Sequence, residues 1–191
     1  RRRGLIYFIT YPDSEGHWQG LYNRTVLDGL GKAGYDCHKI VLDFFSPDCH
    51  GVLRDIQMIR SSPEDIWLFA WAQNPAIELV EHKPGRKFGH IHGLGCFPFE
   101  PSVLAGVDLN EPVRFGYYDG LFTNSAWSYR NAIASYPEHQ KRFVITGFPM
   151  NYNVYADYLS IAKDERLVVF NQRFALERAP TLVIELAGLL S

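Results

Sequence analysis

The sequence predicts an α/β fold built on a doubly wound, mostly parallel sheet of the Rossmann-like kind. Apolar strand-like runs alternate with helix-like segments along the whole chain, and the connections between them are short and polar. The chain contains no internal repeat and no low-complexity tract. This alternation is typical of βαβ units, in which parallel strands are covered by helices on both faces.

Seven strands are expected, because seven apolar runs are bounded by polar or glycine-containing residues. The third run is apolar nearly throughout, as is typical of a strand that is covered on both faces. The strands are expected at 5–10, 35–43, 65–72, 87–93, 120–126, 142–149 and 165–173.

Five helices are expected between and after these strands. Apolar residues recur every three or four positions in the first two, which indicates one buried face. Asn74 and Pro75 supply a cap and a first residue for the third, and Ser125 caps the fourth. The helices are expected at 21–32, 48–61, 74–82, 125–135 and 177–190.

The order of these elements predicts a division of the chain. Residues 1–150 are expected to form an N-terminal Rossmann-like domain, and residues 151–165 a linker. Residues 166–191 then supply one strand and one helix, which is too little for a second domain. We therefore expect the chain to be part of a longer polypeptide and to be inactive by itself.

Composition excludes several classes of protein. The 191 residues carry a formal net charge of −2, so the chain offers no basic surface for a nucleic-acid backbone. The three cysteines are an odd number and form no CxxC pair, which favours a reducing compartment. No apolar run approaches the roughly 20 residues of a membrane span. We expect a cytoplasmic protein that could also associate with the inner membrane surface.

The loop after the first strand is a candidate binding loop, because ligands of open parallel sheets bind beyond the carboxyl ends of strands. Its sequence "YPDSEGHWQG" places Gly16 and Gly20 around His17 and Trp18. Glycines let the backbone approach a ligand, and the next helix offers free N–H groups. The alternative is an ordinary surface loop.

Two histidines, His90 and His92, lie two residues apart in the fourth strand and so share a face. They could be half of a zinc site, although no companion ligand has a telling spacing. His92 could instead donate a hydrogen bond to a substrate oxygen, or could simply end the strand. After the fifth strand, Asn124 and Ser125 mark a helix start whose N–H groups could face a pocket.

The sequence contains no GxSxG, Walker or GxGxxG motif. What remains is an ordered set of weaker motifs. "HIHG", "DGLFTNSAWSYRNA" and "VITGFPMN" follow the first glycine-bearing loop, and "VVFNQRFALER" places Arg173 five residues before Arg178. Together they resemble the retaining, nucleotide-sugar-dependent glycosyltransferases of the GT-B fold, and the resemblance covers nearly the whole chain. Arg178 stands where that family usually carries Lys.

The resemblance implies a sugar transfer from a nucleoside-diphosphate donor to a sugar, lipid-linked or protein acceptor. It implies that Arg173 and Arg178 hold the donor diphosphate, that His92 meets the sugar, and that the Gly16–Gly20 loop lies near the acceptor or the diphosphate. No metal and no cofactor are implied. A homodimer is a further expectation, because the apolar residues of the last helix need a covering surface.

Three other classes stay open. A non-catalytic α/β binding module is one, although a receiver domain would need an Asp after the third strand. A metal-dependent hydrolase would use His90 and His92. A nucleotide-sugar epimerase has a similar architecture, but its nucleotide signature would be expected near the first loop, where none is seen.

Overall fold

The computed structural model describes residues 4–13, 18–44, 46–91, 103–104, 107–108 and 112–149. All of them belong to one compact unit, Arg1–Asn151. The expected linker, strand and helix after residue 150 lie outside the described residues. The same holds for five of the candidate site residues, which are Gly16, His17, His92, Arg173 and Arg178.

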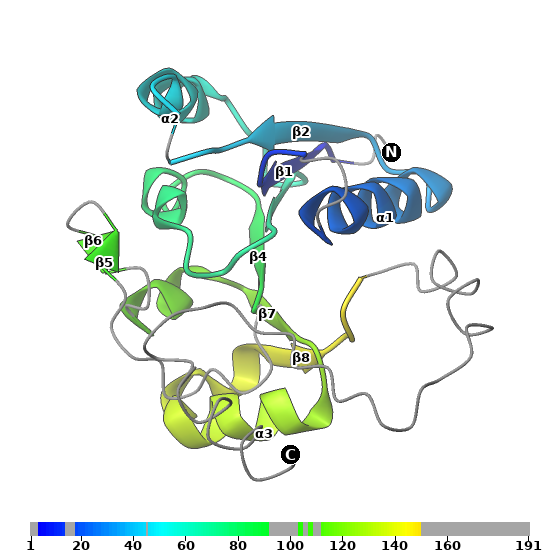
Figure 1. Ribbon diagram of the computed structural model, residues 1–191, viewed down its shortest axis with the longest axis vertical. Coiled ribbons are helices and arrows are strands. Elements are labelled where there is room, and N and C mark those ends of the chain that lie inside the picture. Colours follow the sequence, from blue (N-terminus) through cyan, green and yellow to red (C-terminus); the bar gives the residue numbers. More distant parts are fainter. Residues whose placement is uncertain are drawn as a thin grey trace, which may run out of the picture. The chain divides into compact units, whose positions relative to one another are not determined.

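The core of the structure is a six-stranded, all-parallel sheet in the order β2-β1-β3-β4-β7-β8 (Figure 1). The six strands correspond to the first six that the sequence predicts, which confirms the α/β, Rossmann-like fold class. The strands are β1 (Ile6–Thr10), β2 (Cys37–Val41), β3 (Ile66–Phe69), β4 (Arg86–His90), β7 (Gly120–Thr123) and β8 (Phe143–Ile145).

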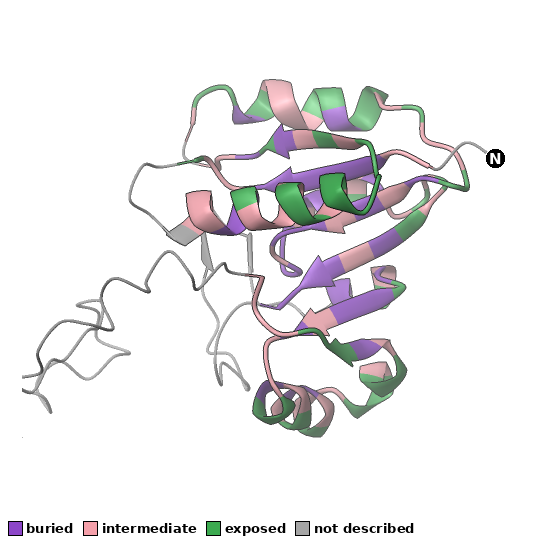
Figure 2. Cartoon of the chain, turned by 90° about the vertical axis from the view of Figure 1, so that its right-hand side faces the viewer, coloured by how far each residue is buried: buried purple, intermediate pink, exposed green. Residues whose placement is uncertain are grey.

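Helices cover both faces of this sheet, and side chains that alternate along β1 contribute to the apolar core on each face. Phe8 points to one face and packs with Tyr22 of α1 (Trp18–Lys32). Ile9 points to the other face, where the larger core also contains Ile56 of α2 (Cys49–Met58) and Ala132 of α3 (Ala126–Ser135). Buried residues accordingly follow the strands, and exposed ones lie on the outer sides of the helices (Figure 2).

The third helix starts as predicted but differs in type and length. Residues 74–82 do not form an α-helix; Pro75–Leu79 form a short 3-10 helix, η1. Asn74 caps it as predicted, since its side chain accepts from the Ala76 N–H (2.9 Å). The helical turn ends at Leu79, and the chain then turns into β4 through Gly85, whose φ is positive (99°).

Four short elements were not predicted. Val103–Leu104 (β5) and Val107–Asp108 (β6) form a separate antiparallel pair. Pro112–Tyr117 (η2) and Pro137–Arg142 (η3) are 3-10 helices that each begin at a proline. Proline sets φ for a helical first residue, but segments of five or six residues carry too little periodicity to be recognised in a sequence.

Candidate functional site

All six strands run in the same direction, so their carboxyl ends form one edge of the sheet, which we call the carboxyl edge. The strand order reverses between β1 and β3, because the chain goes from β1 to β2 on one side and continues from β3 to β4 on the other. In doubly wound sheets ligands bind beyond the strand ends at this reversal. The side chains of the carboxyl edge are therefore the first place to look for a site.

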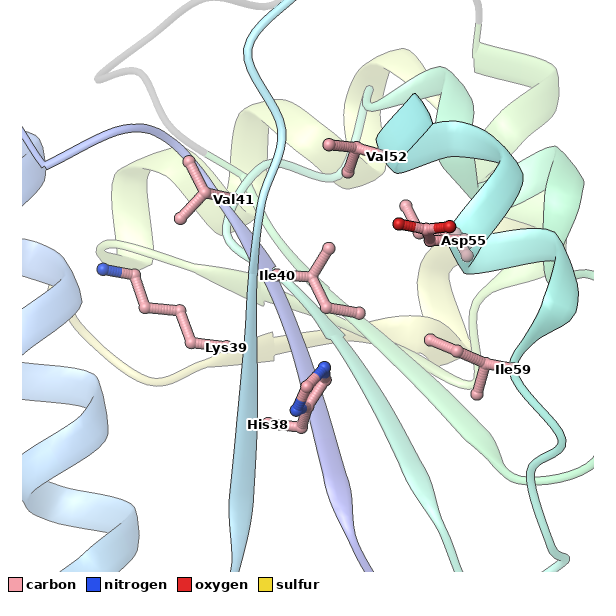
Figure 3. Close-up of a pocket in the computed structure, with 8 residues that line it drawn as sticks. His38, Lys39, Ile40, Val41, Val52, Asp55 and Ile59 are labelled. Atoms are coloured by element: carbon pink, nitrogen blue, oxygen red, sulfur yellow. The ribbon is translucent and has the colours of Figure 1, made fainter. Parts of the chain in front are cut away.

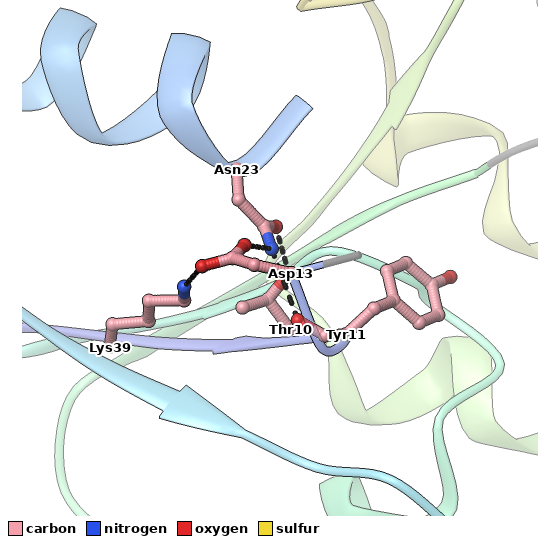
Figure 4. Close-up of polar contacts among 5 residues, drawn as sticks. All are labelled: Thr10, Tyr11, Asp13, Asn23 and Lys39. Carbon is pink, nitrogen blue, oxygen red and sulfur yellow. Dashed lines mark hydrogen bonds and ion pairs between the residues drawn. The ribbon is translucent and has the colours of Figure 1, made fainter. Parts of the chain in front are cut away.

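A network of hydrogen bonds holds the segment after β1 in place (Figure 4). The Thr10 hydroxyl donates to Asn23 Oδ1 of α1, and both residues are buried. Asn23 Nδ2 donates to the Tyr11 carbonyl (3.0 Å) and to Asp13 Oδ1 (2.7 Å). Asp13 Oδ2 in turn forms an ion pair with Lys39 of β2. The network joins β1, α1 and β2 at the carboxyl edge.

The network keeps Asp13 ionised. The hydrogen bond from Asn23, followed by the one from Lys39, lowers the pKa of the Asp13 carboxyl below its ordinary value. The positive charge of Lys39 is balanced by the negative charge of Asp13. This corner of the site thus presents a neutralised pair, not an isolated positive charge.

Aromatic rings line the neighbouring strand ends. Tyr11 after β1 and Trp71 after β3 lie nearly parallel, with ring centroids 6.4 Å apart and an interplanar angle of 28°. Tyr22 of α1 and Phe148 after β8 each approach the ring of His90, at centroid distances of 5.7 and 5.5 Å. Both rings of the first pair are only half-buried, so they leave apolar surface at the carboxyl edge.

His90 is the last residue of β4 and is 2% exposed. Burial lowers the pKa of its imidazole to about 4, although a hydrogen bond with the Gly147 backbone opposes the shift. The ring is therefore neutral at physiological pH. Within the described part of the chain, no group of three or more His, Cys, Asp or Glu side chains could hold a metal ion.

The exit of β4, meaning His90 and Ile91, lies between two neighbouring segments. On one side the Ala72 N–H donates to the His90 carbonyl (2.9 Å), and on the other the Ile91 N–H donates to the Phe122 carbonyl (2.9 Å). Gly89 permits the first contact, because a Cβ there would lie 2.9 Å from the Ala72 Cβ. A glycine at this position thus lets the segment after β3 pack across β4.

Two amide side chains follow these contacts. Gln73 comes directly after Ala72 and is 2% exposed, and Asn124 comes directly after β7. Gln73 Oε1 and Asn124 Oδ1 are both buried, and neither has a hydrogen-bond partner among the described residues. Each of the two segments that flank the exit of β4 thus leads into a residue with a buried amide oxygen that can accept a hydrogen bond.

The structure places some of the sequence-predicted site residues. Ser125 caps α3, since its hydroxyl accepts from the Ser128 N–H (3.1 Å), and Asn124 lies beside it at the carboxyl edge. The sequence predicted Gly20 in the loop before the helix. The structure places it in the first turn of α1, because that helix begins at Trp18. The roles expected for these residues stay predictions.

Sequence reasoning missed five residues of the carboxyl edge. None of them is among the candidates named from the sequence; they are Thr10, Asp13, Asn23, Lys39 and Gln73. Thr10 and its partner Asn23 are 13 residues apart along the chain, and Lys39 and its partner Asp13 are 26 residues apart. A sequence motif could have pointed only to Gln73 and Thr10, because they stand where apolar runs end.

A separate cleft of about 260 Å³ lies between the edge strand β2 and helix α2 (Figure 3). Its walls are four consecutive residues of β2 and one face of α2, and Val52, Asp55 and Ile59 face the strand in Figure 3. This cleft runs beside the sheet and not across its strand ends. We do not assign it to the candidate site.

No helix in the ranges that the structure describes has the length and apolar character needed to cross a membrane.

The sequence matches no known protein family, and a search of curated proteins finds no relative. Among solved structures, the chain is similar to the UDP-GlcNAc 2-epimerase from Methanocaldococcus jannaschii, with a TM-score of 0.54 and 12% identity. The similarity covers 84% of this chain and 54% of the epimerase, so the chain spans about half the length of that structure. At this identity the likeness shows a Rossmann-like fold of the GT-B-like kind.

Proposed function

We propose that the protein acts on nucleotide sugars, and that it transfers the sugar of a nucleoside-diphosphate donor to an acceptor. The described domain would be the acceptor-side half of a GT-B enzyme. One observation carries the proposal: the carboxyl edge of a GT-B-like sheet combines half-buried aromatic rings with buried hydrogen-bond acceptors. The motifs that resemble glycosyltransferases add support from the sequence.

The chemistry of this edge suits a carbohydrate. Apolar C–H faces of a sugar ring pack on aromatic rings such as Tyr11 and Trp71. Sugar hydroxyls donate hydrogen bonds, and Gln73 and Asn124 supply acceptors beside the same strand ends. A nucleotide-sugar reaction needs a place for a sugar at the face of the N-terminal domain, and the carboxyl edge offers one.

The diphosphate is assigned to residues outside the described part of the chain. We propose that Arg173 and Arg178, at the strand-to-helix transition in "VVFNQRFALER", bind its oxygens. Negative charge grows there as the glycosidic bond breaks, so cations stabilise the transition state more than the ground state. No metal and no cofactor is part of this proposal.

We expect Arg178→Ala to lower the turnover of the full-length natural protein by about 10²- to 10³-fold, the effect of removing one such electrostatic contact. Arg178→Lys, which keeps the charge, should retain more activity than Arg178→Ala. Arg54→Ala, on the exposed face of α2, is the control. Equal turnover of Arg178→Ala and the wild type would remove the diphosphate role.

An epimerase is the second candidate, because the similar solved structure is a UDP-GlcNAc 2-epimerase. The two functions separate by product analysis. UDP-, GDP-, ADP- and TDP-sugars are incubated with the full-length protein, with and without methyl glycosides as acceptors, and the products are identified by NMR. We expect free nucleoside diphosphate and a new glycoside when an acceptor is present. An epimeric nucleotide sugar formed without any acceptor would show that the protein is an epimerase.

A further inference from the structure

The segments that carry Gln73 and Asn124 flank the exit of β4 on opposite sides. The N–H of Ala72, just before Gln73, donates to the carbonyl of the last residue of β4 (2.9 Å). The carbonyl of Phe122, two residues before Asn124, accepts from the residue after β4 (2.9 Å). These backbone hydrogen bonds hold both amide-bearing segments against the same strand end.

Each amide ends in an oxygen that is buried and lacks a hydrogen-bond partner in the described structure. Gln73 is 2% exposed as a whole residue. Leaving a buried acceptor unpaired has a cost that native proteins rarely accept without a reason, such as a ligand that completes the bond. Two such oxygens, on residues of the two segments that flank one strand end at the ligand-binding edge of a doubly wound sheet, point to a ligand.

The ligand must donate hydrogen bonds, because an amide oxygen can only accept them. A sugar hydroxyl or an N–H group can do so, whereas the oxygens of a diphosphate carry no proton at neutral pH and cannot donate to these two atoms. Lys39, which could attract a phosphate, is already paired with Asp13. The groups that the structure describes at this edge therefore favour an uncharged, hydroxyl-bearing ring.

We propose that Gln73 and Asn124 bind hydroxyl groups of a sugar ring at the exit of β4 and so select the sugar portion of the substrates. This inference rests on the proposed function and deepens it, since it assigns the sugar, and not the diphosphate, to this site. The aromatic pair of Tyr11 and Trp71 offers the apolar side of the same edge. The ring belongs either to the donor or to the acceptor, which share this hydroxyl chemistry.

The first test measures the stability of Gln73→Leu. Leucine has a similar volume but no acceptor, so the variant removes the unpaired buried oxygen. We expect the Tm of the unliganded chain to rise by about 2–4 °C. Gln57→Leu makes the same chemical change on the exposed face of α2 and should shift the Tm by less than about 1 °C. A lower Tm for Gln73→Leu would show that the amide is bonded within the protein, which overturns the inference.

The second test measures binding by calorimetry, with the full-length natural protein. The probes are UDP-GlcNAc, UDP-glucose and GDP-mannose as donors, UDP and GDP without a sugar, and methyl glucoside and methyl mannoside as acceptors. We expect Gln73→Leu and Asn124→Leu each to weaken binding of a sugar-bearing probe by about 3- to 10-fold, the usual effect of one lost neutral hydrogen bond. Binding of UDP and GDP should not change.

The arms of this experiment separate the outcomes. Weakening of the nucleotide sugars assigns the ring to the donor, and weakening of the glycosides assigns it to the acceptor; either supports the inference. Sugar-bearing probes that bind the wild type and both leucine variants equally overturn the inference and leave the proposed function standing. A full-length wild-type protein that binds none of the probes contradicts the proposed function, and the inference with it.

Discussion

His90 shows how one buried side chain makes stability depend on pH. Its imidazole lies at the end of β4 against the rings of Tyr22 and Phe148, and burial lowers its pKa to about 4. The unfolded chain would bind a proton at this histidine near pH 6.5, its ordinary pKa. Between about pH 6.5 and pH 4 the unfolded state therefore binds more protons, and stability falls as the pH falls.

We predict that the wild type loses about 2–3 kcal/mol more of its free energy of unfolding between pH 7.0 and pH 4.5 than His90→Gln does. Urea unfolding at the two pH values measures the difference. His82→Gln is the control, because the His82 side chain is 92% exposed, and it should keep the slope of the wild type. Parallel pH profiles for the wild type and His90→Gln would contradict the burial argument.

At the scale of single elements, the packing of β4 depends on a glycine. A Cβ at Gly89 would lie 2.8 Å from Tyr118 Cε1 and 2.9 Å from the Ala72 Cβ, whereas one at Gly29, in the exposed part of α1, would meet nothing within 4 Å. The same substitution should therefore have opposite effects at the two positions. Only the first would push the segment that carries Gln73 away from the strand.

We predict that Gly89→Ala lowers the free energy of unfolding by about 1–3 kcal/mol through overcrowding. Gly29→Ala should raise it by about 0.5–1 kcal/mol, because alanine is the better residue in a helix interior. Chemical denaturation of the two variants beside the wild type gives both values. An increase in the free energy of unfolding for Gly89→Ala would contradict the close packing of β4 against Ala72.

The sequence predicted the elements unevenly, and for physical reasons. The first six strands and three helices have apolar patterns strong enough to be recognised. The segment after Asn74 carries the cap of a helix, but a cap marks only where a helix begins, and this one is a 3-10 helix that ends at Leu79. The Ser125 cap was predicted correctly because a side chain and the N–H groups that it caps lie within one turn of each other.

At the scale of the whole molecule, the sequence predicted where a site should lie but not which side chains would meet there. Strands in a parallel sheet end at one edge, so the loops after them could be named in advance. The pairing of Asp13 with Lys39 and the two amides at the exit of β4 depend on strand order and register. Neither can be obtained from one sequence without its fold.

The central claim is that a nucleotide sugar or its acceptor binds at the carboxyl edge of the sheet. The most direct measurement is an NMR titration of the isotope-labelled chain with the probe that binds best in the calorimetric screen. We predict that the amide signals of Ala72, Gln73, Asn124 and Gly147 shift together on binding, while those of Val52, Asp55 and Ile59 in the β2–α2 cleft stay in place. Shifts confined to the cleft, with the carboxyl edge unchanged, would contradict the account.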